Sequence, residues 1–206
     1  MKIFNSPIIS KKYKGSAIAI GNFDGVHKGH QKVFVKARKF AKKNKIKFGI
    51  LTFTPLPVMF FNKKVSNYRL TSEDQKFKIL KKNEVDFLVN IKFDKAFSKI
   101  KALKFIKNII YKKINPKLIF VSNNFKFGNK RKGNIDLLKK FSKKCNFKLL
   151  KISPFMYQGK IISSTRIRKY LKNGYLGLAN MLLSRTWFID GQVQGGKKLG
   201  RKLGYR

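Results

Sequence analysis

Short apolar runs alternate with amphipathic stretches along most of the chain, and this alternation constrains its fold most. Val33, Phe34, Ala37, Phe40 and Ala41 recur at helical spacing between two apolar runs. The predicted strands are 16–20, 46–53, 86–91, 118–121 and 147–152, and helices are predicted at 71–82, 102–113 and 134–144. Helices between strands indicate right-handed crossovers. We therefore expect an α/β fold, a doubly wound parallel sheet with ligands at the carboxyl ends of its strands.

The first predicted strand ends at a glycine-rich loop, GNFDGVHKGH, which holds both histidines of the chain. Gly21, Gly25 and Gly29 permit a tight loop and close approach of the backbone to phosphate. His27 and His30 lie three residues apart near the start of the following helix. Imidazole N–H groups and a helix N-terminus together can hold a pyrophosphate as its charge grows. The pattern favours nucleotide chemistry over the alternative that the histidines are ordinary loop and cap residues.

Asp24 is the one acidic residue inside this loop. Three roles are open to it: holding a histidine, holding a metal-bound water, or capping the loop. A zinc site needs three or four donors, whereas the chain has no further histidine and a single cysteine, Cys145, far away in the sequence. We predict no metal-ligating residues.

A second motif, ISSTRIR at 162–168, opens a helix that we expect to end near Asn173. Hydroxyls, guanidinium groups and free backbone N–H groups at a helix start form a cradle for anions. The alternative is an ordinary N-cap on a basic helix. Phosphates need donors on both sides, so the histidine loop in the same chain favours the anion cradle.

The net charge of +42 suggests nucleic acid at first sight. Only eight of the 50 basic residues are arginine, the residue suited to bidentate phosphate and base recognition. The lysines are scattered over every predicted helix and form no single stripe. We expect no specific nucleic-acid partner, only weak, salt-sensitive binding of polyanions, although a non-enzymatic RNA-binding protein stays an alternative.

The cysteine count and the hydropathy pattern bear on location. A single cysteine allows no internal disulfide, which fits a reducing compartment. Lysines interrupt the N-terminal apolar residues almost at once, and no uncharged run approaches the roughly 18 residues that span a membrane. We expect a cytoplasmic protein without a membrane partner, and the sequence does not indicate its oligomeric state.

Five segments occur in the order seen in bacterial FAD synthetases: GNFDGVHKGH, FTPLP, RLTSEDQKFKIL, FVSNNFKFGNKRKGN and ISSTRIR. The chain resembles this bifunctional family, in which an FMN adenylyltransferase precedes a riboflavin kinase. The resemblance implies a Rossmann-like nucleotidyltransferase domain of the HxGH type that uses ATP and Mg²⁺ to convert FMN into FAD and pyrophosphate. Another HxGH enzyme, such as a cytidylyltransferase or a nicotinate or pantetheine phosphate adenylyltransferase, is the alternative.

The resemblance also implies roles for individual residues. The implied catalytic residues are His27, His30 and Arg168. The implied ATP-binding residues are Gly21, Phe23, Asp24, Gly25, Gly29, Ser163, Ser164, Thr165 and Arg166, and the implied FMN-binding residues are Pro55, Pro57, Asn124, Phe125 and Phe127. The chain departs from the family pattern at Ser122 and Asn124, where glycine and aspartate are usual, and at Leu56, where histidine is frequent.

The last segment, from Ser184, resembles the opening of the riboflavin kinase barrel, without the Pro-Thr-Ala-Asn segment that follows in the family. We therefore expect an adenylyltransferase domain over residues 1–183 and a truncated, β-rich kinase remnant over 184–206. About 20 residues cannot bury a core of their own, so this remnant should pack on the first domain or stay mobile. Riboflavin kinase activity is expected to be absent.

Overall fold

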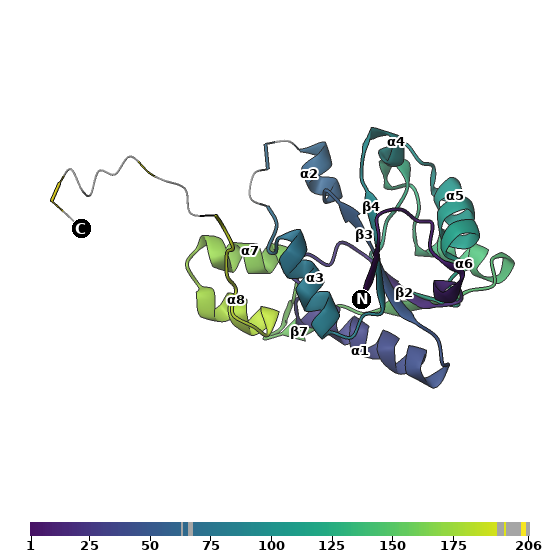
Figure 1. Ribbon diagram of the computed structural model, residues 1–206, viewed down its shortest axis with the longest axis horizontal. Helices are drawn as coiled ribbons and strands as arrows, with labels where there is room; N and C mark the ends of the chain where they lie inside the picture. The colour runs from purple at the N-terminus through teal and green to yellow at the C-terminus, as the bar shows by residue number, and fades with distance from the viewer. Residues whose placement is uncertain (63, 66–67, 193–195, 197–202, 205–206) are drawn as a thin grey trace.

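A six-stranded parallel sheet forms the centre of the molecule (Figure 1). The computed structural model describes residues 1–62, 64–65, 68–192, 196 and 203–204. The strand order is β1-β4-β3-β2-β5-β6, with bounds Lys2–Phe4 (β1), Ala17–Ile20 (β2), Phe48–Thr54 (β3), Phe87–Lys92 (β4), Leu118–Ser122 (β5) and Lys148–Ile152 (β6). The five predicted strands are confirmed, and β1, which pairs with β4 at the edge of the sheet, was not predicted.

Helices cover both faces of this sheet, as a doubly wound fold requires. On one face lie α1 (Lys28–Lys43) and α3 (Glu73–Lys82), and on the other lie α5 (Ala102–Lys104), the π-helix η2 (Phe105–Ile114) and α6 (Ile135–Lys144). Strand β2 serves both layers, because Ala17 and Ala19 pack in the core under α1 while Ile18 and Ile20 pack in the core under η2. The Rossmann-like prediction is confirmed.

The order of the strands places a crevice beside β2. From β2 the chain builds outward through β3 and β4 on one side, then crosses to β5 on the other side. The loops that leave β2 and β5 therefore diverge, and ligands of open α/β sheets bind at such a switch point, outside the carboxyl ends of the strands. The histidine loop leaves β2 at this point.

A small helical layer stands at one end of the sheet (Figure 1). It consists of α7 (Ser164–Lys172), α8 (Leu176–Leu183) and the antiparallel hairpin of β7 (Met156–Tyr157) and β8 (Lys160–Ile161). Ile167, Leu182 and Leu183 are buried in a core of their own together with Leu70. The helix α7 ends at Lys172 with Asn173 as its C-cap, as predicted, and Gly174 follows in a left-handed conformation. Neither the hairpin nor α8 was predicted.

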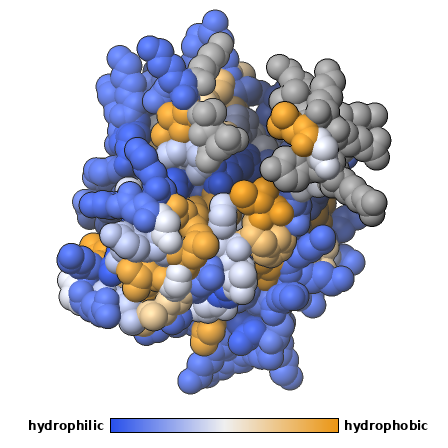
Figure 2. Space-filling model, turned by 90° about the vertical axis from the view of Figure 1, so that its left-hand side faces the viewer, coloured by the Kyte–Doolittle hydropathy of each residue, from blue (hydrophilic) through white to orange (hydrophobic). Residues whose placement is uncertain are grey.

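Figure 2 looks onto this end of the molecule, where hydrophobic side chains gather among hydrophilic ones. Leu176 and Met181 of α8 are exposed, as is Met156 of the hairpin. No helix among the described residues is long and apolar enough to cross a membrane. The remaining short helices are η1 (Lys11–Tyr13), α2 (Pro57–Phe61), α4 (Lys95–Ser98) and η3 (Asn129–Arg131).

The predicted kinase remnant lies partly outside the described residues. Residues 193–195, 197–202 and 205–206 are not described, so the expected β-rich character cannot be followed there. Over 184–192 no strand forms; Arg185 and Trp187 are half-buried, and the other residues of this stretch are exposed. The indole of Trp187 donates to the carbonyl of Leu70, and the backbone N–H of Trp187 donates to Asn180.

Candidate active site

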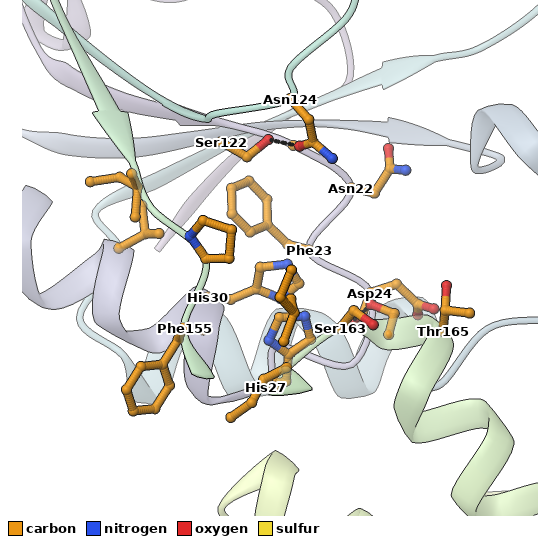
Figure 3. A pocket seen from close by; sticks show the side chains of 18 of the residues that line it. Asn22, Phe23, Asp24, His27, His30, Ser122, Asn124, Phe155, Ser163 and Thr165 are labelled. Atoms are coloured by element: carbon orange, nitrogen blue, oxygen red, sulfur yellow. Dashed lines mark hydrogen bonds between the residues drawn. The ribbon is translucent and has the colours of Figure 1, made fainter. Parts of the chain in front are cut away.

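A cavity of about 460 Å³ opens at the carboxyl ends of β2, β5 and β6, at the predicted switch point (Figure 3). Several segments of the chain line it: the histidine loop, the FTPLP segment, Tyr68, the segments after β5 and β6, and the start of α7. The sequence-predicted residues on its wall are Gly21, Phe23, Asp24, His27, Gly29, His30, Asn124, Ser163, Ser164, Thr165 and Arg168. The fold thus brings the two motifs together although they lie more than 100 residues apart.

The histidine loop is tightly wound. Phe23, Gly25 and Val26 all have positive φ angles, of 49°, 76° and 40°. A Cβ at position 25 would lie 2.7 Å from a methyl carbon of Leu70, so this position requires glycine. Gly25 is therefore placed behind the loop, away from the cavity wall, where it shapes the turn.

Asp24 holds this loop against the segment before α3. One carboxylate oxygen accepts a hydrogen bond from the backbone N–H of Leu70 at 3.0 Å, and the other pairs with the guanidinium of Arg168. The Asp24 side chain is 5% exposed, so the pair is largely shielded from water. Of the three roles open to Asp24 from the sequence, the structure favours fastening the loop, because both oxygens are occupied and neither contacts a histidine.

The two histidine rings stack on one another at the start of α1. Their centroids lie 3.7 Å apart with an angle of 18° between the planes, and the ring of Phe23 packs edge-on against His30 (Figure 3). A Cβ on Gly29 would lie 3.1 Å from two ring atoms of His27. Glycine at position 29 therefore lets the His27 ring lie across the first turn of the helix.

Both imidazoles are neutral at physiological pH. Burial lowers the pKa of His27 from 6.5 to about 4, with a further lowering by the charge of Arg185. Burial also lowers the pKa of His30 well below 6.5, and the neighbouring His27 and Lys76 add to this. The Nδ1 atoms of both rings are buried without a hydrogen-bond partner among the described residues. Neutral rings offer N–H donors for an incoming anion.

The start of α7 lines the same cavity as the histidines (Figure 3). Ser163 caps the helix, accepting a hydrogen bond from the backbone N–H of Arg166 at 3.2 Å. Ser164 donates from its hydroxyl to the carbonyl of Asp24 at 2.8 Å, which ties α7 to the histidine loop. Thr165 lies exposed at the cavity wall. The helix start combines a positive dipole end with hydroxyl groups, a combination that suits an anion.

The two arginines of this motif point in different directions. Arg168 lines the cavity, donates to the carbonyl of Tyr68 at 2.7 Å and lies 3.6 Å from the centre of the Tyr68 ring. Arg166 lies outside the cavity, where its guanidinium donates to the carbonyls of Tyr157 and Lys160, both at 3.0 Å. Arg166 thus braces the β7–β8 hairpin, a placement that differs from the predicted contact with ATP.

The FTPLP segment reaches the cavity through residues other than its prolines. Leu56 and Val58 line the wall, whereas Pro55 and Pro57 do not. The prolines flank Leu56, and Pro57 opens α2. The departure from the family pattern at Leu56 therefore puts an apolar side chain at the cavity.

In the loop after β5, too, only some of the predicted residues line the cavity. Asn124 lines the cavity, and its side-chain oxygen accepts a hydrogen bond from the Ser122 hydroxyl at 3.0 Å (Figure 3). The rings of Phe125 and Phe127 stack on one another with centroids 5.4 Å apart, outside the cavity wall. Phe127 is 7% exposed in the core against Phe105, so these rings hold the loop in place.

Sequence patterns missed several residues that build the site. Tyr68 and Phe155 line the cavity, and Lys76 and Arg185 lie behind the histidine loop. Lys76 is 4% exposed, although nothing distinguishes it in the sequence from the other lysines. Among the described residues, no three His, Cys, Asp or Glu side chains gather as metal ligands would.

Comparison with known proteins shows the family of this chain. The family model described as FAD synthetase matches residues 9–166. A protein of Buchnera aphidicola from Schizaphis graminum, named bifunctional riboflavin kinase/FMN adenylyltransferase, is 46% identical over 96% of this chain and 64% of its own length. The Escherichia coli K12 protein of the same name is 32% identical over 93% of this chain and 61% of its own length.

A solved structure also has this fold. It is described as a macrolide-efflux protein from Streptococcus pneumoniae, has a TM-score of 0.82 and 26% identity, and covers 98% of this chain and 66% of that one. The chain spans 61 to 64% of the length of the named bifunctional relatives given above. The chain belongs to the FAD synthetase family.

Proposed function

We propose that this chain is an FMN adenylyltransferase of the cytoplasm, which transfers AMP from ATP to FMN and releases FAD and pyrophosphate. The observation that carries the proposal is the placement of two anion-binding elements on the wall of one cavity. The histidine pair is one of these elements, and the serine-capped start of α7 is the other. Membership of the FAD synthetase family supports the choice of FMN and ATP as substrates.

The reaction needs alignment more than it needs an acid or a base. A phosphate oxygen of FMN attacks the α-phosphorus of ATP, a bond forms between them, and the bond to the bridging oxygen of pyrophosphate breaks with its electrons staying on pyrophosphate. The nucleophile is already anionic, so no proton has to be removed from it. What the site must supply is orientation and compensation of the charge that grows on the leaving group.

We assign this compensation to His27 and His30. As neutral donors in a buried setting they lose little hydrogen-bonding capacity to water, so their N–H groups would be strong partners for the leaving pyrophosphate. The start of α7, with Ser163 and Thr165, would also bind phosphate in this cavity. Arg168 would contribute positive charge at the wall while it holds Asp24 and Tyr68.

Mg²⁺ suits this cavity as a companion of ATP. Mg²⁺ commonly binds through substrate phosphates with only one or two protein carboxylates. Asp24 is the only carboxylate on the described cavity wall, and its oxygens are engaged by Leu70 and Arg168, so the protein offers no ready-made cage. When bound with ATP, Mg²⁺ would neutralise phosphate charge, and Asp24 would at most contact water around the ion.

FMN would occupy the part of the cavity near FTPLP and the loop after β5. Leu56 and Val58 offer apolar surface there, and Asn124 offers an amide that can donate and accept hydrogen bonds. Pro55, Pro57, Phe125 and Phe127 would act on FMN through the loops they stiffen.

One incubation tests the proposal. Purified protein is mixed with Mg²⁺, ATP and FMN and the products are separated by chromatography, with riboflavin replacing FMN in a parallel sample. FAD above a blank without protein supports the proposal, and no FAD above that blank refutes it. FMN formed from riboflavin would refute the expectation that the kinase activity is absent.

A further inference from the structure

A buried lysine holds the histidine loop from behind at its first turn. The ammonium of Lys76 donates to the carbonyl of Asn22 at 2.9 Å and to the hydroxyl oxygen of Thr52 at 2.8 Å. Thr52 in turn donates to the same carbonyl of Asn22 at 3.1 Å. Lysine is almost never this buried unless it is paired, and both hydrogen-bond partners here are neutral oxygens. Burying a charged ammonium group in this way costs folding free energy, so its position behind the loop indicates a role in the site.

An arginine holds the same loop at its second turn. The guanidinium of Arg185, just after α8, donates to the carbonyl of Gly25 at 2.7 Å and to the carbonyl of Leu183 at 3.3 Å. The amide of Gln31 bridges the same two segments, donating to Val26 at 2.9 Å and to Leu183 at 3.1 Å. Arg185, which lies beyond the expected domain boundary at residue 183, is thus bound to the histidine loop.

Lys76 and Arg185 each lower the pKa of one histidine. Beyond the effect of burial, the charge of Lys76 lowers the pKa of His30 and the charge of Arg185 lowers the pKa of His27. Three charged groups face Lys76, namely Arg69, Asp24 and Glu73, and Asp24 also faces Arg185. Burial, followed by the charge of Arg69, lowers the pKa of Lys76 from 10.5 to about 8.

The hydrogen bond at Asn22 also sets the direction of a backbone donor. In a trans peptide the carbonyl and the next N–H point in opposite directions. The bond from Lys76 to the Asn22 carbonyl therefore turns the N–H of Phe23 away from Lys76, and both Asn22 and Phe23 line the cavity. Fixing the carbonyl from behind thus fixes a donor at the front of the loop.

We propose that Lys76 and Arg185 are positioning residues for adenylyl transfer, which hold the histidine loop by the carbonyls of Asn22 and Gly25 and place positive charge behind the two histidines. This inference rests on the proposed function for its catalytic part. It also assigns Arg185 to the adenylyltransferase site, so the functional unit extends past the boundary at residue 183 that the sequence suggested.

Four variants test the proposal by kinetics. Lys76→Met and Arg185→Gln remove each charge, and Lys78→Met and Arg131→Gln are controls at exposed positions. We expect kcat for FAD formation to fall on the order of ten- to a hundredfold in the first two, as misplacement of a reacting group does, and to stay unchanged in the controls. Rates in Lys76→Met and Arg185→Gln equal to those of the controls would overturn the proposal.

The pH profile separates positioning by charge from mere packing. As pH rises through about 8, Lys76 loses its proton and its charge, so kcat of the unaltered protein should fall there. Arginine stays charged at this pH, so Lys76→Arg should keep its rate to higher pH. An identical alkaline fall in both proteins would contradict the role of the Lys76 charge.

An NMR titration needs no substrate, and it distinguishes failure of this inference from failure of the proposed function. The chain has two histidines, so two sets of imidazole signals report the site. Arg185→Gln should raise the pKa of His27, whereas Arg185→Lys and Arg131→Gln should leave it unchanged. If no FAD is made but this shift appears, the proposed function fails and the charge effect on the histidines stands. An unmoved pKa overturns the inference even if FAD is made.

Discussion

Acidification from pH 7.5 to 5 is expected to cost the protein about 2 kcal/mol of folding free energy through His27 alone. His27 is 6% exposed, and its pKa falls from 6.5 in the unfolded chain to about 4 in the folded one. Between these values the unfolded chain binds more protons, so acid favours unfolding. The full difference of 2.5 pKa units is worth about 3.4 kcal/mol, of which about 2 kcal/mol is lost by pH 5.

Urea unfolding of the unaltered protein and of His27→Gln at both pH values measures this term. The glutamine variant has no group to titrate at position 27, so its loss of stability between pH 7.5 and 5 should be smaller by about 2 kcal/mol. Comparing each protein with itself across pH cancels the constant cost of the substitution, and the contribution of His30 to the acid dependence remains in both. Equal losses in the two proteins would show that His27 is not buried as a neutral ring, and the reasoning on neutral donors would fail.

Three further outcomes are expected. His30→Ala should lower kcat for FAD formation about a hundredfold, as loss of a preorganised donor does, and unchanged turnover in the folded variant would make His30 structural. Arg166→Ala should lower the melting temperature by a few degrees with KM for ATP nearly unchanged, and a large rise in that KM would show that Arg166 binds ATP after all. RNA binding measured on filters should vanish between about 50 and 300 mM salt while FAD formation persists, and RNA binding that survives would favour a nucleic-acid function.

The strands and helices of the sheet could be predicted because their signals are local. Strand β2 alternates its side chains between two cores, and Ser72 with Gln75 forms the capping box typical of a helix start. Strand β1 has only three residues and these are largely exposed, so it shows no hydrophobic alternation that could be detected in the sequence. The β7–β8 hairpin has two residues in each strand, which is too short for a hydrophobic alternation to show in the sequence. Its pairing depends instead on packing against α7.

The site could be predicted in its motifs but less well in its individual residues. Residues two apart on a helix do not share a face, so Arg166 and Arg168 could not both face the cavity, and spacing alone does not say which of them does. Lys76 is one basic residue among 50, and only its burial sets it apart. Arg185 contacts the loop through the path of the chain after α8, a tertiary feature without a local signal.

Transfer of label from ATP tests the central claim most directly. Protein is incubated with Mg²⁺, FMN and ATP that carries radioactive phosphorus in the α-position. Labelled FAD is measured by its radioactivity over time, and the unlabelled pyrophosphate is measured in the same samples by a chemical assay. The account predicts label in FAD, with one pyrophosphate released per FAD, and a rate about a hundredfold lower in His30→Ala. Pyrophosphate or AMP without labelled FAD would contradict it, because the cavity would then cleave ATP without joining its adenylyl group to FMN.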